Sequence, residues 1–149
     1  MDLSQLKELQ RKLKSLNRSR VEQDFKQVML NNSENFTTYV ADNWKQGKRP
    51  DGSIIGTYRS FAYEVEKRQR NPIANGNVDL IDTGSLKRGL IVNHLNGAFF
   101  NVFSTDKKAV DISDKYGVDV FGVPKDKKEQ ELEEVASEVM KLELAYLGL

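Results

Sequence analysis

The segment LIVNHLNGAFFNVF, residues 90–103, places an Asn-Gly pair between two apolar runs. This is the strongest short-range signal for a two-residue hairpin turn, because both central residues need a positive φ. We therefore predict strands over 90–95 and 98–103, joined at Asn96 and Gly97. If Leu95 pairs with Ala98, one face carries Ile91, Phe100 and Val102, and the other carries Leu90, Val92, Phe99 and Phe103. Both faces are apolar, so we expect other elements to cover both.

Shorter elements flank this hairpin on both sides. Residues 78–81 and 118–123 are short apolar runs that predict two further strands. Residues 104–116 carry caps and charges and predict one or two helical turns that end at Gly117. The inward residues of these turns are expected to be Val110, Ile112 and Tyr116.

The N-terminal part has the apolar spacing of amphipathic helices. Its first stripe consists of Leu3, Leu6, Leu9, Leu13 and Leu16, and Val21, Phe25, Val28 and Met29 continue it to about Leu30. Such a narrow stripe fits two interpretations, packing on its own domain or packing against a neighbouring subunit. We predict that Ser33 caps a second helix, which ends at Gly47 and whose face carries Phe36, Tyr39, Val40 and Trp44.

The remaining segments complete an α+β fold. Turn chemistry predicts loops over 47–58 and 71–77, on either side of a helix at 60–70. Beyond Pro124, Asp126 and Glu129 have capping-box spacing. A helix face then follows through Leu132, Val135, Ala136, Val139, Leu142, Tyr146 and Leu147. We expect a single domain over 1–149, with a helical part (1–46), a mixed core containing a small antiparallel sheet (47–123) and a long C-terminal helix (124–149).

Composition excludes several classes of function. Lys and Arg total 23 against 22 Asp and Glu, so the net charge of +1 creates no global attraction to nucleic acid or anionic membrane. The absence of cysteine removes disulfides and thiolate metal sites, and His94 is the only histidine. No apolar run approaches the length of a membrane span, and the first residues lack the layout of a signal peptide. We expect no cofactor, no metal site and no membrane partner.

Asp82-Thr83-Gly84 is the one motif with a catalytic precedent, because aspartic proteases carry Asp-Thr-Gly. Such enzymes need two carboxylates that share one proton, and this chain contains the motif once. The alternative interpretation is structural: Asp82 or Thr83 caps a turn near Ser85, and Gly84 supplies permissive backbone. We favour the turn and predict no catalytic residue.

Other polar groups have simpler explanations than a binding site. The acidic residues over 106–119 lack the alternating pattern of a calcium loop, and His94 lacks a partner ligand. Basic clusters occupy 11–20, 45–49 and 67–70, and they form a nucleic-acid-binding stripe only if the fold unites them. Solvated helix faces explain these clusters more simply.

The run VDLIDTGSLKRGLIV (78–92), followed by the hairpin and FFNVFS (99–104), resembles the core of tail-completion and head–tail connector proteins of tailed bacteriophages. DGSIIGTY (51–58), STDKK (104–108) and Tyr116-Gly117 are similar to virion proteins of crAss-like phages that infect Bacteroides-like hosts. The resemblance covers about 51–123, and the helical ends depart from the shortest family members.

This resemblance implies a non-enzymatic virion subunit, assembled in the host cytoplasm. It implies a homo-oligomeric neck ring between portal or adaptor and tail proteins, with non-specific contact to DNA passing through the lumen, and a structural part for the Asp-Thr-Gly turn. We expect loops 47–58 and 71–77 to reach partners. The candidate interface residues are Leu3, Leu6, Leu9, Leu13, Trp44, Ile54, Ile55, Tyr58, Leu142 and Tyr146. The alternatives are an aspartic protease using Asp82 and a nucleic-acid-binding module.

Overall fold

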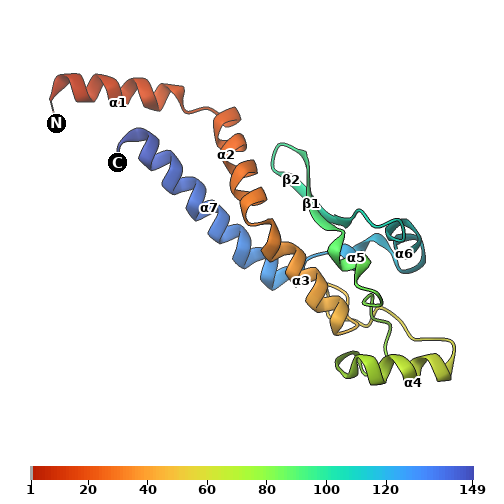
Figure 1. Cartoon of the computed structure of the whole chain (residues 1–149). Helices are drawn as coiled ribbons and strands as arrows, with labels where there is room; N and C mark the ends of the chain where they lie inside the picture. Colours follow the sequence, from red (N-terminus) through yellow and green to blue (C-terminus); the bar gives the residue numbers. More distant parts are fainter. Residues whose placement is uncertain (1) are drawn as a thin grey trace.

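The computed structural model describes residues 2–149, which form an elongated α+β molecule, as the sequence predicted (Figure 1). The helices are α1 (Leu3–Ser15), α2 (Arg18–Asn31), α3 (Ser33–Lys45), α4 (Phe61–Arg70), α5 (Ser85–Arg88), α6 (Ala109–Tyr116) and α7 (Lys125–Leu147). The strands β1 (Leu90–Asn96) and β2 (Phe99–Ser104) form one antiparallel hairpin. Two 3₁₀ turns, η1 (Pro72–Ala74) and η2 (Val118–Phe121), complete the chain.

The predicted hairpin is confirmed, but its register differs by one residue from the expected pairing. Asn96 pairs with Phe99 and His94 with Phe100, so an irregularity at Leu95 removes that residue from the ladder. The turn therefore lies at Gly97 and Ala98, and only Gly97, not Asn96, has a positive φ. Because side chains alternate along a strand, a shift of one residue places each side chain of β1 beside the β2 side chains that were expected on the opposite face.

One face of the hairpin now carries Val92, Phe100 and Val102, which pack against the residues of α2, α3 and α7. Ile91 pairs with Phe103 on the opposite face, rather than sharing a face with Phe100. Phe103 packs on Phe121, with ring centroids 4.5 Å apart, whereas Ile91 is exposed. The expectation that both faces are fully covered is therefore wrong for Ile91.

The two additional strands predicted at 78–81 and 118–123 are absent from the described residues. Near the first segment, only an isolated bridge joins Thr57 to Asn77. The second segment forms η2, because Gly117 (φ 91°) redirects the chain and the carbonyl of Val120 accepts a hydrogen bond from the Trp44 indole at 2.7 Å. Apolar content alone was therefore misleading here, because it does not distinguish a buried strand from a buried 3₁₀ turn.

Helix boundaries also differ from the predictions in three places. The N-terminal helix is interrupted at Leu16 and Asn17, and the Asn17 side chain caps α2 by accepting a hydrogen bond from the Arg20 amide. Ser33 is the first residue of α3 rather than its cap. The predicted capping box at Asp126 does not form, because α7 begins directly after Pro124.

The core consists of two adjoining clusters in the body of the molecule. The first surrounds Trp44 and Phe121, whose rings meet edge to face at 5.5 Å. The second joins Phe36 to Val135 and Val139 of α7. Two predicted inward residues, Val110 and Ala136, are instead exposed. Loop 71–77 is only partly exposed, since Ala74 and Gly76 within it are buried.

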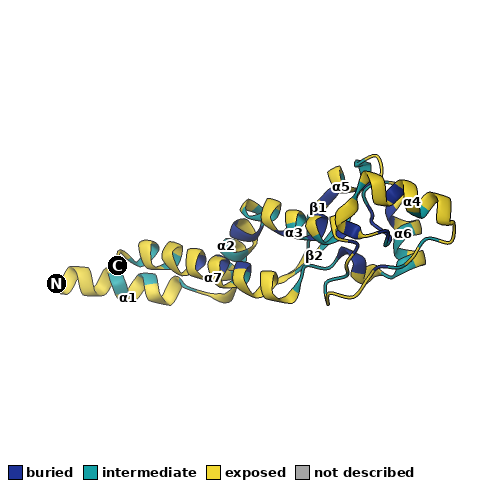
Figure 2. Cartoon of the chain, turned by 90° about the horizontal axis from the view of Figure 1, so that it is seen from below, coloured by how far each residue is buried: buried dark blue, intermediate teal, exposed yellow. Residues whose placement is uncertain are grey.

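Burial is unevenly distributed along the molecule (Figure 2). Buried residues gather in the body, whereas α1 and residues 140–149 project from it and are mostly exposed, at the same end of the molecule (Figures 1 and 2). We call α1 together with residues 140–149 the arm. Within residues 2–149, no helix is long and apolar enough to cross a membrane.

Candidate functional site

The Asp-Thr-Gly segment forms a tight turn that starts α5. Gly84 adopts a left-handed conformation (φ 79°, ψ 0°), and the hydroxyl of Thr83 accepts a hydrogen bond from the Ser85 amide at 3.4 Å. Ser104, at the end of β2, donates its hydroxyl hydrogen to the carbonyl of Leu86 at 2.7 Å. The bond from Ser104 holds α5 against the hairpin, and Gly84 has the permissive backbone that the structural interpretation of this motif expected.

Asp82 itself does not have the surroundings of a proteolytic carboxylate. Its side chain is about half exposed and pairs with Arg70 at 3.3 Å. The other carboxylate near the turn, Asp79, is bound by Lys67. Two carboxylates that share a proton must lie together without neutralising cations, and these two lack that arrangement.

A buried ion pair lies behind the turn, and sequence reasoning missed both of its residues. The ammonium of Lys67 on α4 lies 2.6 Å from the Asp79 carboxylate, with the two side chains 4% and 1% exposed. Lys67 also donates to the carbonyl of Ile81 at 2.9 Å, and Asp79 accepts from Asn71 at 2.9 Å. The signal available in the sequence was a lone carboxylate within the apolar run 78–81, because such a group needs a cation when buried.

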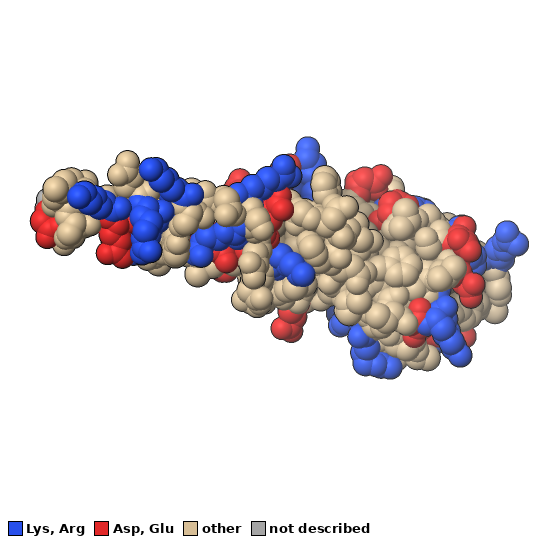
Figure 3. All heavy atoms as spheres, turned by 90° about the horizontal axis from the view of Figure 1, so that it is seen from above, with Lys and Arg blue, Asp and Glu red and all other residues tan. Residues whose placement is uncertain are grey.

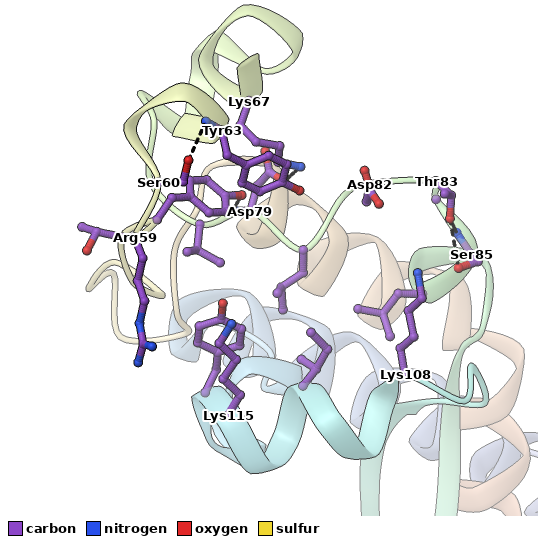
Figure 4. Close-up of a pocket in the computed structure, with 18 residues that line it drawn as sticks. Arg59, Ser60, Tyr63, Lys67, Asp79, Asp82, Thr83, Ser85, Lys108 and Lys115 are labelled. Carbon is purple, nitrogen blue, oxygen red and sulfur yellow. Dashed lines mark hydrogen bonds and ion pairs between the residues drawn. The ribbon is translucent and has the colours of Figure 1, made fainter. Parts of the chain in front are cut away.

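These residues border a pocket of about 680 Å³ that lies between α4, the Asp-Thr-Gly turn and α6. Figure 4 shows Lys108 and Lys115 rising from α6 toward the pocket, with Tyr63 and Lys67 of α4 on the opposite side. Leu86 and Ile112 contribute apolar wall. The pocket therefore combines an apolar lining with several charged groups.

Tyr58 also lines this pocket and joins its ring edge to face with Tyr63 at 5.0 Å. Its hydroxyl oxygen accepts a hydrogen bond from the Asp79 amide at 3.2 Å. Burial, assisted by the nearby Asp79 charge, raises the pKa of Tyr58 to about 12. The phenol therefore remains neutral at physiological pH and acts as an acceptor.

A second buried carboxylate, Glu131 of α7, connects that helix to α3. It accepts hydrogen bonds from the Tyr39 hydroxyl at 2.7 Å and from the Asn35 amide group at 3.1 Å. The bond to Glu131, together with burial, raises the pKa of Tyr39 above its usual value. Within residues 2–149, no group of three or more His, Cys, Asp or Glu side chains could hold a metal ion, here or elsewhere.

His94 lies in β1 and has a structural environment. Its Nε2 hydrogen-bonds with the Gly97 carbonyl at 3.0 Å, and its ring packs beside Phe100 with centroids 5.0 Å apart. These contacts hold the hairpin turn. They account for the residue without a catalytic partner.

The basic clusters do not combine into one stripe. Residues 11–20 lie toward the arm, whereas 45–49 and 67–70 lie at the opposite end of the molecule (Figure 1). Many of their cations are paired, including Arg49 with Asp119 at 2.8 Å and Arg20 with Glu143 at 3.1 Å. Figure 3 shows basic and acidic side chains interspersed along the visible face.

The candidate interface residues separate into two groups. Trp44 is fully buried and Ile55 is 4% exposed, so both belong to the core and were wrongly predicted as contact residues. Tyr58 is half-buried and packs against the core. Ile54 is exposed on the body, and Leu142 is exposed on the arm. The other candidates also lie on the arm: Leu3, Leu6, Leu9, Leu13 and Tyr146.

The arm presents the largest contrast between composition and burial. No residue of α1 is buried, and Leu3, Leu6 and Leu13 are 68%, 49% and 50% exposed. With Leu9 they border a shallow hollow that only α1 residues line. No protein-family model, curated protein or solved structure significantly matches the chain, so these surfaces are interpreted from their own chemistry.

The arm is held to itself mainly by polar contacts. The hydroxyls of Ser15 and Tyr146 hydrogen-bond at 2.6 Å. The guanidinium of Arg20 stacks 3.7 Å from the centre of the Tyr146 ring while pairing with Glu143. Tyr146 therefore serves an internal contact, whereas Leu3, Leu6 and Leu13 of α1 remain about half or more exposed.

Proposed function

We propose that this chain is a non-enzymatic structural subunit of a bacteriophage virion, a head–tail connector or tail-completion protein that forms a homo-oligomeric ring between portal and tail. The observation that carries the proposal is the exposed leucine stripe of the arm. A stripe of this kind supports subunit packing rather than chemistry.

The physical reason is that α1 lacks the support a short helix needs. Isolated helices of this length are marginally stable in water, and most helix stability in proteins comes from packing an apolar face. Here Leu3, Leu6 and Leu13 face solvent. A neighbouring subunit that covers them would stabilise the helix and remove apolar surface from water.

Covering the arm would contribute a favourable free energy to association. Fully burying a leucine contributes about 1.5–3 kcal/mol, so the half-exposed leucines of α1 each contribute roughly half of that. Met140, Leu142 and Leu144 of α7 add exposed apolar surface to the same arm. A closed ring has as many interfaces as subunits, so ring closure adds one interface that an open row of the same subunits lacks.

The resemblance of 51–123 to phage neck proteins supplies the biological setting. In this proposal the Asp-Thr-Gly turn and hairpin form the structural centre of a ring subunit located in the virion. Portal and tail genes beside the gene for this chain would agree with that setting, and genes of an unrelated function there would contradict it.

Native mass spectrometry and sedimentation of the full chain test the proposal, alone and after mixing with the portal and tail proteins of the same phage. We expect a homo-oligomer or a complex with one of those proteins. Leu6→Gln with Leu13→Gln should abolish that association, with any loss of helix content limited to α1.

Arg11→Gln with Lys14→Gln is the matched control, because both residues are exposed on the same helix and lie outside the leucine stripe. This variant should assemble as the wild type does. If the full chain stays monomeric and binds neither the portal nor the tail proteins, the proposed function is refuted.

A further inference from the structure

The pocket beside the Asp-Thr-Gly turn has an unbalanced charge. Its lining carboxylates are Asp79, which pairs with Lys67, and Asp82, which shares Arg70 with Glu66. Its other lining cations are Arg59, Lys108 and Lys115, and none of them pairs with a carboxylate within residues 2–149. The lining therefore carries four cations against two carboxylates, an excess of two positive charges.

Nearby groups do not remove this excess. Asp106 accepts a hydrogen bond from the backbone amide of Lys108 at 2.8 Å but forms no ion pair with its ammonium. The ammonium of Lys115 lies 5.0 Å from the centre of the Tyr116 ring, a contact that leaves its charge available. Since the whole chain has a net charge of only +1, the positive field is local to this pocket.

The pocket is also preorganised. Its inner side is anchored by the Lys67–Asp79 pair, which is almost fully buried, and its wall includes Leu86 and Ile112. The buried pair and the apolar wall are already in place before a ligand binds. Arg59, Lys108 and Lys115 are exposed, so only these side chains have to be ordered on binding.

The shape decides which anion fits. A volume of about 680 Å³ is typical of sites that enclose a small molecule or a few side chains. Duplex DNA presents its phosphates along a rod and requires a basic surface that follows it. The cations here line a partly open concavity, and its apolar wall suits the aliphatic part of a glutamate or a neighbouring apolar side chain.

We propose that this pocket binds an acidic peptide segment of a partner protein, with side-chain carboxylates against Arg59, Lys108 and Lys115. This site is separate from the arm and does not depend on the proposed ring. It assigns the Asp-Thr-Gly region a second use, as one wall of a docking pocket.

Fluorescence anisotropy at low ionic strength tests the proposal, with a fluorescein-labelled oligoglutamate peptide as probe and the full chain as receptor. We expect saturable binding that weakens with salt. Lys108→Glu with Lys115→Glu should reduce affinity by more than about tenfold, because like charges then face the ligand carboxylates.

The matched control is Lys87→Glu with Lys107→Glu, which changes net charge equally at two exposed lysines outside the pocket. It should bind the peptide within about twofold of the wild type, since a twofold change is only a few tenths of a kcal/mol. Circular dichroism should show the same helix content in both variants.

Three outcomes would overturn the inference: no binding of the peptide at low salt, equal loss in the pocket and control variants, or tighter binding of a duplex DNA oligonucleotide that displaces the peptide. The last result would assign the pocket to phosphates instead. Because neither variant alters the arm, loss of peptide binding with intact assembly separates this site from the proposed function.

Discussion

Replacing Lys67 with methionine removes the cation of the buried pair but keeps a side chain of similar length. The Asp79 carboxylate, 1% exposed in the wild type, then stays in the interior with hydrogen bonds from Asn71 and the Ile81 amide but no counter-charge. The carbonyl of Ile81 also loses the hydrogen bond that it accepts from the Lys67 ammonium. The expected effect is a large loss of stability rather than a local adjustment.

The size of the loss follows from the burial of both partners. Removing one member of a buried pair costs about 3–5 kcal/mol, because the remaining charge is desolvated without compensation. A domain of ordinary stability has only about 5–15 kcal/mol in total. Asp79→Asn in the Lys67→Met background removes the stranded charge and should recover more than half of the loss.

Urea unfolding followed by far-ultraviolet circular dichroism measures these differences. Arg68→Met is the control, because Arg68 is adjacent on α4 and pairs with Glu64 at 2.8 Å on the surface. An exposed pair contributes about 0.2–1 kcal/mol, so this variant should remain close to the wild type. If Lys67→Met and Arg68→Met lose equal stability, or the second substitution restores nothing, the buried-pair argument is refuted.

Three further predictions concern other parts of the body. Trp44→Phe removes the indole that donates to the Val120 carbonyl and should lower the free energy of unfolding by about 2–4 kcal/mol. Urea unfolding followed by circular dichroism measures this loss, and a value below about 1 kcal/mol would contradict the prediction. Gly117→Ala should cost about 1–3 kcal/mol by the same measurement, because φ is 91° and a Cβ would lie 2.5 Å from the Asp119 carboxylate; an unchanged midpoint would show that this turn relaxes. Tyr58, whose pKa is raised from 10.0 to about 12, favours the folded state below pH 10 and loses that contribution as pH rises to about 12. Tyr58→Phe should reduce this alkaline decline and the late phenolate absorbance, to which Tyr39, whose pKa is also raised, contributes the remainder; titration of every tyrosine near 10 would argue against burial.

Local sequence patterns predicted most of the helices and the hairpin, because their signals depend on nearby residues. The Asn-Gly pair between apolar runs located the hairpin, and leucine spacing located α1. The same patterns predicted a hairpin register that differs by one residue from the observed one, and they predicted a strand over 118–123, where the structure has η2. Register depends on how Leu95 leaves the ladder, and η2 depends on Trp44, which lies far away in sequence.

The candidate site was less accessible to sequence reasoning than the fold. The positive φ of Gly84 was expected from the sequence, because it is a local property. The expected cap by Asp82 or Thr83 is not made, since no side-chain hydrogen bond caps α5. The pairing of Lys67 with Asp79 and the convergence of cations on the pocket require contacts between α4, α6 and the turn.

The sequence by itself determined the α+β class, the hairpin and the amphipathic α1, because periodicity and turn chemistry act over a few residues. Only the tertiary structure decided which apolar side chains are buried. Trp44 and the leucines of α1 have similar helical patterns, yet Trp44 is enclosed by η2 and the leucines are exposed on the arm. Whether a side chain is buried depends on which other segments of the chain pack over it, and helical spacing does not contain that information.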